Sequence, residues 1–243
     1  MDHVRPEAGF PKPLNALSGT NLLHMVSHEL RTPFAVIQSS AELLQMLERA
    51  SSAGDSCLVS RTAGNILHEV AHVTEILNRI TLLSEMQSGK YAQVEEFVDL
   101  EDLLCRLLES YFSPWKDGRM ADLAISGSPR DVWTDPVMLK LVMRNLLENA
   151  FKYSPGGRPP VVRAKFLPEC WSVTVRDYGI GIPEKDQPRL FKPFVRASNV
   201  GSVPGTGLGL MTVMQLVKRL EGRVRIWSIE GKGTLATVTF GGD

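Results

Sequence analysis

Apolar residues recur at helical spacing in two segments of the first third of the chain, and a short polar run separates them. The separating run, residues 51–56, reads Ser-Ser-Ala-Gly-Asp-Ser, which is typical of a loop. Intervals of three and four residues predict a long helix on each side, and the short connection predicts that the two helices pack antiparallel. The apolar positions are Leu23, Val26, Leu30, Phe34, Ile37, Ala41 and Leu44 in the first segment, and Ile66, Val70, Val73, Leu77 and Ile80 in the second.

A helical hairpin of this kind has one apolar flank that neither of its helices covers. A second copy of the chain would cover it by forming a four-helix bundle, so we expect a homodimer. Ser88-Gly89-Lys90 ends the second helix and places the hairpin at residues 18–90. Residues 1–17 contain three prolines and no apolar periodicity, which predicts a tail or a linker.

From residue 95 to residue 243 the pattern becomes a mixture of helical and alternating segments. The segments with helical periodicity are residues 100–112, 136–153 and 212–220. Asp135 precedes the second of these helices and is a suitable N-cap. The segments with strand-like alternation are residues 161–166, 171–177, 223–229 and 234–240. This order predicts a second domain, a two-layer α/β sandwich whose sheet is mostly antiparallel, and hence a multidomain α and α+β fold class.

The composition narrows the classes of function. Lys plus Arg and Asp plus Glu are both 27, and a net charge of zero disfavours a basic nucleic-acid binder or a polybasic membrane-surface protein. No apolar run approaches the roughly 18 residues of a membrane span, and the first residues lack a secretory signal. Cys57, Cys105 and Cys170 are far apart, which favours small buried side chains over a disulfide framework. We therefore expect a cytoplasmic protein.

His28 begins the sequence His-Glu-Leu-Arg-Thr-Pro on the first helix of the hairpin. Pro33 has no N–H, and its ring clashes with the carbonyl of Glu29, which predicts a kink just beyond the histidine. His24, His28 and Thr32 recur every four residues on a face away from the apolar stripe. A neutral imidazole beside a carboxylate can act as a nucleophile, whereas the alternative is an ordinary solvated surface histidine.

His68 and His72 on the second helix match the H-E-x-x-H pattern of zinc peptidases. The two histidines share a helical face and could hold zinc together. However, the apolar stripe of this helix predicts that both point out of the bundle, and no third ligand follows at a recognisable motif. We therefore favour a solvated helix surface over zinc hydrolysis.

Two glycine-rich segments are the strongest chemical signals in the second domain. Residues 177–183, Asp-Tyr-Gly-Ile-Gly-Ile-Pro, follow a predicted strand, and residues 205–210, Gly-Thr-Gly-Leu-Gly-Leu, open a predicted helix. Glycines at a helix start let backbone N–H groups approach phosphate oxygens. Neither segment is a P-loop or a dinucleotide fingerprint. A buried Asp177 needs a donor, and an adenine amino group would serve.

The stretch between Pro183 and Gly205 has no clear periodicity. A loop of this length in a compact domain is usually a lid, and the alternative is a plain surface insertion. Its candidate functional residues are Phe191, Lys192, Phe194 and Arg196.

Asn145 and Asn149 are four residues apart on one face of the helix predicted at 136–153, with Glu148 and Lys152 nearby. Amide oxygens are modest ligands for a hard cation that keeps its waters and shares phosphate oxygens, which describes Mg²⁺ with ATP. Lys152 could meet a phosphate, and Tyr153 could stack on a base. Taken alone, an ordinary polar helix face explains these residues equally well.

Together and in this order, these segments resemble the sensor histidine kinases of two-component signalling. The resemblance covers about residues 20–240, and it implies a dimerisation and phosphotransfer hairpin followed by a catalytic domain at residues 95–243. That domain would have the Bergerat-type ATP-binding fold shared with gyrase and heat-shock chaperone ATPases. The matching segments are the H box at the first helix, the N box at 145–153, the glycine boxes at 177–183 and 205–210, and the F box at 191–196.

The resemblance implies a role for each matching residue. His28 would be the phospho-acceptor, and Glu29 and Thr32 would form the E-x-x-T element linked to dephosphorylating the partner. Relatives that are plain ATPases have a glutamate base where this chain has Asn145, so water would be poorly activated here. The implied nucleotide ligands are Asn149 and Asn145 for Mg²⁺, Lys152 and Arg196 for phosphate, Tyr153 for the base, Asp177 for the adenine amino group, and Gly179, Gly181, Gly205, Gly207, Gly209 and Thr234 around them.

The implied activity is ATP-dependent autophosphorylation of His28, transfer of the phosphoryl group to an aspartate of a response regulator receiver domain, and dephosphorylation of that regulator. An upstream sensor domain or a sensory partner protein would supply the signal. Two alternatives remain, a phosphotransfer scaffold with an inactive nucleotide domain and a serine kinase or plain ATPase on the same sandwich. The chain departs from the family at Leu220-Glu221-Gly222, where relatives usually have a Gly-Gly pair.

Overall fold

The computed structural model describes residues 19–49, 56–112, 115, 117–128, 130–201, 203, 205 and 207–242. The chain divides into two compact units, of which one ends at Ala92 and the other begins at Gln93. No helix in the described ranges combines the length and the apolar character that crossing a membrane requires.

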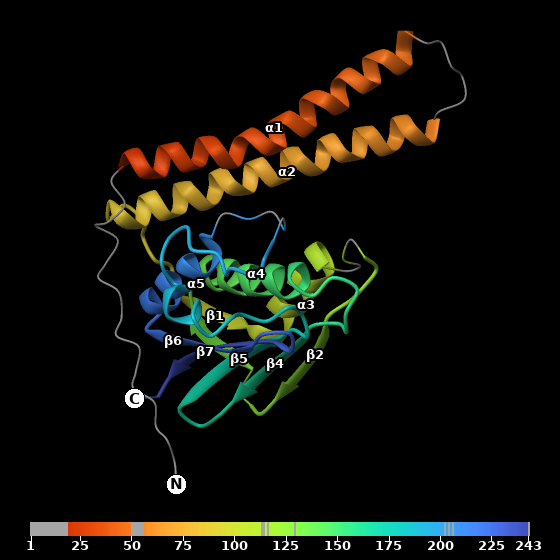
Figure 1. Ribbon diagram of the computed structural model, residues 1–243. Helices are drawn as coiled ribbons and strands as arrows, with labels where there is room; N and C mark the ends of the chain where they lie inside the picture. Colours follow the sequence, from red (N-terminus) through yellow and green to blue (C-terminus); the bar gives the residue numbers. More distant parts are fainter. Residues whose placement is uncertain are drawn as a thin grey trace. The chain divides into compact units, whose positions relative to one another are not determined.

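The first unit is a hairpin of two long helices, α1 (Gly19–Arg49) and α2 (Ser56–Gln87), which pack along each other (Figure 1). The predicted pair of helices is confirmed. Pro33 lies inside α1, and the axis of α1 changes direction near the middle of the helix in Figure 1. A proline in a helix interior removes one backbone hydrogen bond, so a bend of this kind is expected.

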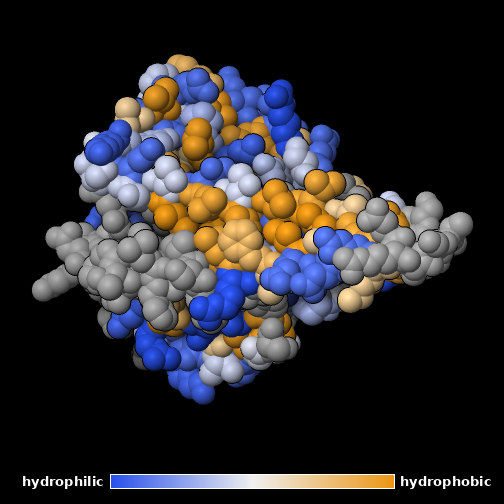
Figure 2. All heavy atoms as spheres, turned by 90° about the horizontal axis from the view of Figure 1, so that it is seen from above, coloured by the Kyte–Doolittle hydropathy of each residue, from blue (hydrophilic) through white to orange (hydrophobic). Residues whose placement is uncertain are grey.

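The apolar stripe of the hairpin is only partly buried by its two helices. Ile76 is 5% exposed, whereas Phe34, Val70 and Leu77 remain 46% to 53% exposed. Ile76 is not one of the predicted stripe positions, and the described members of the stripe are all half-buried or exposed, so the hairpin alone does not bury the stripe. We call the exposed apolar side chains of the hairpin, taken together, the exposed apolar flank, and Figure 2 shows apolar side chains gathered along the hairpin. Its members are Phe34, Val36, Leu43, Met46, Val59, Leu67, Val70 and Leu77.

The second unit is a two-layer sandwich, in which helices cover one face of a five-stranded sheet (Figure 1). The strand order is β2-β4-β5-β7-β6, and neighbouring strands are antiparallel except for the parallel pair β2 and β4. The strands are β2 (Asp122–Ser126), β4 (Val161–Phe166), β5 (Cys170–Arg176), β6 (Gly222–Ile229) and β7 (Gly233–Gly241). The helices are α3 (Leu100–Phe112), α4 (Pro136–Lys152) and α5 (Gly209–Arg219). This architecture confirms the predicted α/β sandwich.

The core of the second unit lies between the helices and one face of the sheet. Val162, Val173 and Val238 on the central strands are fully buried, as are Leu139 and Leu147 on α4. Alternate positions on β4 and in the first half of β6 point to the other face and are charged, which is the pattern of a sheet covered on one side, whereas Trp227 and Ile229 at the end of β6 are exposed apolar residues.

Three strands and one helix start differ from the sequence prediction. A separate two-stranded sheet pairs β1 (Glu96–Asp99) with β3 (Asp131–Thr134), and neither these strands nor β2 were predicted. Each has five residues or fewer, which is too short for alternation alone to predict a strand, so pairing rather than pattern defines it. Helix α5 begins at Gly209, three residues before the predicted start, because the last glycine of the second glycine box is already helical.

Cysteine burial was also predicted incorrectly. Cys105 and Cys170 are free thiols that are only half-buried. Cys105 lies at the edge of the buried face of α3, and Cys170 is the first residue of β5. The side chain of Cys57 lies outside the described part of the structure.

The segment at residues 220–222, where relatives usually have a Gly-Gly pair, adopts a strained backbone in this chain. Glu221 adopts a left-handed backbone with φ of 56°, and the following Gly222 has no room for a Cβ beside the ring of Phe240. A side chain in this conformation costs about 1 kcal/mol or more, which glycine avoids.

Glu221→Gly should therefore raise the free energy of unfolding by about 1 kcal/mol, because it removes the left-handed strain at this turn. Urea unfolding followed by tryptophan fluorescence measures the change. Glu230→Gly is the matched control, since Glu230 is exposed in the next turn and has no left-handed backbone. An equal effect of the two substitutions would show that the strain at Glu221 is not the cause of the change in the free energy of unfolding.

Candidate nucleotide site

Helix α4 carries most of the predicted ligands, and its first turn is fixed by Asp135. The buried Asp135 carboxylate accepts hydrogen bonds through Oδ1 from the backbone N–H groups of Val137 and Met138, both at 3.0 Å. The predicted N-cap is therefore confirmed. Oδ2 of the same carboxylate accepts a bond from the backbone N–H of Val94 at 3.1 Å, so one side chain anchors both the helix and the segment that precedes β1.

The last turn of α4 is held by Arg119, which comes from the loop before β2. Its guanidinium donates to the carbonyl of Phe151 at 3.0 Å and to Oγ of Ser154 at 2.9 Å, and it pairs with Asp117 at 2.7 Å. The sequence gives no signal for this contact, because more than 30 residues separate Arg119 from its partners on α4. The end of α4 that carries the predicted ligands is thus fixed by a buried cation.

Asn145 and Asn149 meet the start of α5. The Asn145 side chain is 2% exposed, and its Nδ2 donates to the carbonyl of Leu141 at 2.7 Å. That bond orients Oδ1 toward Gly209, where a Cβ would lie 3.2 Å from Asn145 Oδ1 and 3.8 Å from Asn149 Nδ2. A glycine at the first position of α5 therefore lets the N-terminal end of that helix approach both amides closely.

Asp177 lies directly after β5 and is 7% exposed. Its Oδ1 accepts hydrogen bonds from the backbone N–H groups of Gly179 at 3.0 Å and Thr234 at 3.1 Å. Burial raises the pKa of the Asp177 carboxyl above its ordinary value, and the bonds from Gly179 and Thr234 oppose that rise. The structure thus brings together three residues that the sequence analysis named, from two segments that are distant along the chain.

Gly179 packs against the end of α4. A Cβ on Gly179 would collide with the carbonyl of Tyr153, and the N–H of the next residue, Ile180, donates to that carbonyl at 3.0 Å. The first glycine box is therefore pressed against the last turn of the helix that carries the asparagines. Gly181 has a left-handed φ of 60° and lies against the backbone of Ile229.

Two cations gather near the end of α4 beside Gly205. Lys152 Nζ lies 5.2 Å from the centre of the Tyr153 ring, and a Cβ on Gly205 would collide with it. Burial raises the pKa of the Tyr153 hydroxyl, while the charge of Arg196 and a hydrogen bond from it lower this pKa. Arg196 also donates to the carbonyl of Val203. Four predicted site residues therefore lie together.

The predicted lid contains a short 3-10 helix, η1 (Gln187–Arg189), and is anchored by polar residues that sequence reasoning missed. The buried Asp186 carboxylate accepts a bond from the backbone N–H of Ser198 at 2.7 Å, and this bond is the main reason that the pKa of Asp186 is lowered. Asn199 donates to the carbonyl of Gly181 at 3.0 Å. Gly207 has a φ of 73° and packs against Phe194, which is 39% exposed. The lid is thus held together by Asp186 and tied to the first glycine box by Asn199.

For the predicted phosphotransfer residues, the structure describes the helix that carries them and not their side chains. His28, Glu29 and Thr32 lie within α1, but their side chains fall outside the described part of the structure. The same holds for His68 and His72 of the zinc hypothesis, on α2. Their roles remain predictions from the sequence.

Two protein families match the chain in the order of the two units. Residues 13–89 match the His Kinase A (phospho-acceptor) domain, and residues 134–241 match the histidine kinase-, DNA gyrase B- and HSP90-like ATPase. The second match supports the use of ATP by the domain that contains the nucleotide site.

Individual relatives agree with these families. The chain is 31% identical over 236 residues to the autoinducer 2 sensor kinase/phosphatase LuxQ of Vibrio parahaemolyticus, covering 93% of this chain and 27% of the relative. It is 31% identical to the signal transduction histidine-protein kinase/phosphatase MprB of Mycobacterium leprae, covering 82% of this chain and 38% of the relative. The chain thus spans well under half the length of these two curated relatives.

Solved structures of histidine kinases are also similar to this chain. A mycobacterial sensor histidine kinase MprB structure is 30% identical with a TM-score of 0.52, covering 61% of this chain and 98% of that one. The Acinetobacter baumannii histidine kinase AdeS has a TM-score of 0.63 over 88% of this chain and 97% of that one, and at 22% identity it supports the fold alone. The chain belongs to the sensor histidine kinases of two-component systems.

Proposed function

We propose that this chain transfers the γ-phosphoryl group of ATP to His28 and then to an aspartate of a response regulator receiver domain. The observation that carries the proposal is the meeting of Asn145 and Asn149 with the N-terminal end of α5 at Gly209. A helix N-terminus favours phosphate, and amide oxygens suit the divalent cation that accompanies it. The match of residues 13–89 to a phospho-acceptor domain supports the assignment of the acceptor to the hairpin.

The donor set fits Mg²⁺ with ATP. Asn149 and Asn145 would hold the metal, which would neutralise charge on the phosphate oxygens. Lys152 and Arg196 would contact phosphates, and the buried Asp177 would accept a hydrogen bond from the adenine amino group. Because the two N–H groups of Gly179 and Thr234 both bond to Oδ1 of Asp177, its Oδ2 is the atom that would receive that bond.

The reaction requires positioning more than covalent help from the protein. An imidazole nitrogen of His28 would attack the γ-phosphorus, the bond to the β-phosphate oxygen would break, and ADP would leave. Glu29 would hold the other ring N–H. Asn145 occupies the place where related ATPases have a glutamate base, so water competes poorly with the imidazole.

We assign residues 18–90 to dimerisation and phosphotransfer, residues 95–243 to catalysis, and residues 1–17 to a tail or linker. The exposed apolar flank of the hairpin supports a homodimer closed as a four-helix bundle. An upstream sensor domain or a sensory partner protein would regulate the kinase, which we place in the cytoplasm.

Incubation with γ-labelled ATP and Mg²⁺, followed by acid treatment, tests the proposal. We expect a label that acid removes, that His28→Gln abolishes without changing ATP affinity, and that passes to one of a panel of purified receiver domains. An acid-stable label would indicate a serine kinase, and hydrolysis of ATP without label would indicate a plain ATPase. Label that persists in His28→Gln and is lost in His24→Gln would show that His24, and not His28, accepts the phosphoryl group.

We also propose that the chain dephosphorylates its regulator, with Thr32 one turn from His28 positioning a water. Thr32→Ala should spare autophosphorylation and lengthen the lifetime of the phosphorylated regulator about 100-fold, the low end of the effect of losing one positioned catalytic group. Thr81→Ala is the matched control, because Thr81 is exposed on α2. An unchanged lifetime with Thr32→Ala contradicts the assignment.

A further inference from the structure

The face of the five-stranded sheet that the helices do not cover has a regular arrangement of charged and hydroxyl side chains. The strand register places Lys165, Ser172, Thr239 and Arg223 side by side in one row across β4, β5, β7 and β6. The next row repeats the same chemistry with Arg163, Thr174, Thr237 and Arg225. In both rows, therefore, a cationic side chain lies at each end and two hydroxyl side chains lie between them.

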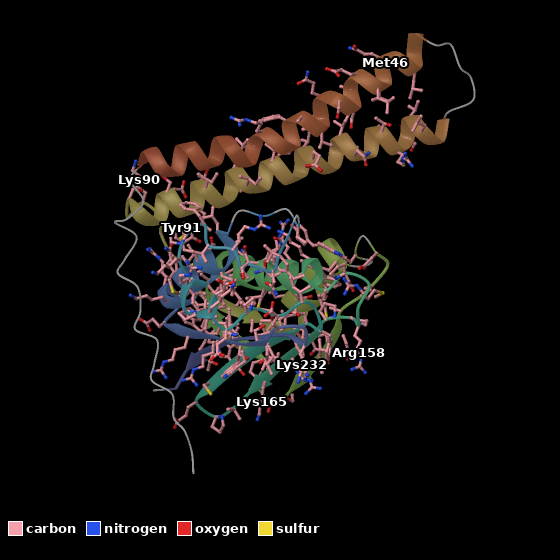
Figure 3. All side chains as sticks on the ribbon, viewed as in Figure 1. Met46, Lys90, Tyr91, Arg158, Lys165 and Lys232 are labelled. Carbon is pink, nitrogen blue, oxygen red and sulfur yellow. The ribbon has the colours of Figure 1, made fainter. Side chains whose placement is uncertain are left out.

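In this arrangement long cationic side chains stand on both sides of short hydroxyl side chains, so the sizes of the residues outline a shallow trough along the strands. Its walls are Arg163 and Lys165 on β4 and Arg223 and Arg225 on β6, all exposed. Its floor consists of short side chains that are half-buried, and Oγ1 of Thr174 lies 3.0 Å from Oγ1 of Thr237. Figure 3 shows Lys165 on the side of the sheet away from α4 and α5. We call this surface the basic trough.

The wall cations lack the acidic partners that five arginines have elsewhere in the same unit. Arg106, Arg119, Arg130, Arg144 and Arg189 each form an ion pair with an aspartate or a glutamate. Within the described residues, none of the four wall cations does so. In a chain with no net charge, four such cations on one face leave a local positive surplus that an anionic partner would neutralise.

The dimensions of the basic trough select the shape of that partner. Three strand spacings of about 4.8 Å separate β4 from β6, so the walls stand about 14 Å apart. An α-helix with its side chains is about 10–12 Å wide and fits between them. A flat bilayer would touch the long walls and leave the hydroxyl floor without contact. At one end, the next row places Trp227 on β6, 51% exposed, across from Leu235 on β7, and Arg176 on β5 lies on the other side of Leu235.

We propose that the basic trough binds an acidic helical segment of a partner protein. Acidic side chains on two flanks of the helix would pair with the walls, and an apolar residue near one end would contact Trp227. This binding does not depend on the proposed kinase activity, since the trough lies on the face of the sheet opposite the helices that carry the nucleotide site.

The test uses a fluorescent, end-blocked peptide of Glu and Ala, about 18 residues long so that it can form a helix, and fluorescence anisotropy with the full chain. We expect saturable binding with a Kd of about 0.1 mM or below that weakens as salt is added. A peptide of the same length and charge, in which two central alanines are replaced by prolines, cannot form the helix and should not bind.

Arg163→Gln combined with Arg225→Gln removes one cation from each wall and should weaken peptide binding about tenfold. Arg106→Gln combined with Lys218→Gln is the matched control, because it removes two exposed cations from the helices of the same unit. Amide chemical shifts of Ser172, Thr174 and Thr237 should change on titration with peptide. ATP affinity should be the same in both double variants, so failure of the kinase proposal would leave this result intact.

Several outcomes would overturn the proposal. They are equal weakening by the control pair, equal binding of the proline peptide, no saturable binding up to about 1 mM peptide, and wall-dependent binding to phosphatidylglycerol vesicles in place of the peptide.

Discussion

Asn149→Ala is expected to abolish autophosphorylation, lowering its rate about 1,000-fold or more. The expected loss follows from removal of a direct metal ligand, since a metal that neutralises phosphate charge contributes several kcal/mol and about 1.4 kcal/mol corresponds to a factor of ten. Transfer of label from γ-labelled ATP at saturating Mg²⁺ measures the rate. The site geometry supports this choice of residue, because the side chains of Asn149 and Asn145 on α4 both lie close to Gly209, the first residue of α5.

The fold should survive this substitution, because Asn149 is only half-buried and the ends of α4 are held by Asp135 and Arg119. Urea unfolding should therefore show a change of less than about 1 kcal/mol. Asn65→Ala makes the same chemical change at an exposed position on α2 and should leave labelling unchanged. Near-normal labelling of Asn149→Ala would contradict the metal assignment.

The local elements of this fold follow from patterns that a single sequence carries. Asp135 before Pro136 predicts the start of α4, and the structure places both capping bonds there. The hairpin helices and the strands β4 to β7 follow from apolar spacing over six residues or more. The strands β1, β2 and β3 have only four or five residues each, too few for such a pattern, so only their partners define them.

The residues of the candidate site also fall into two groups, those that a local motif predicts and those that only a distant contact defines. Glycine boxes and the asparagine pair are visible in the sequence because each is a local motif with its own spacing. Arg119, Asp186 and Asn199 were missed because each acts on a backbone group far along the chain or in an irregular loop. Such contacts carry no periodic signal, although they hold α4 and the lid in position.

The exposed apolar flank leads to the second prediction with a large expected effect, which concerns the oligomeric state of the chain. Met46 and Leu67 are 66% and 71% exposed on the two helices of the hairpin, and apolar surface in water costs roughly 25 cal/mol per Å². We expect sedimentation at micromolar concentration to show twice the 26.9 kDa chain mass. Met46→Lys with Leu67→Lys should shift the chain to a monomer, whereas Leu167→Lys, at a 45% exposed position between β4 and β5, should not.

Mixing two inactive variants then links the dimer to catalysis. A His28→Gln chain retains a nucleotide site, and an Asn149→Ala chain retains the acceptor. If the phosphoryl group passes between subunits, mixed dimers regain label, and the label must lie on the Asn149→Ala chain because it alone has His28. If it passes within one subunit, mixed dimers form and stay unlabelled. Label on the His28→Gln chain would contradict the acceptor assignment, and a single 26.9 kDa species would refute the dimer whichever way the phosphate moves.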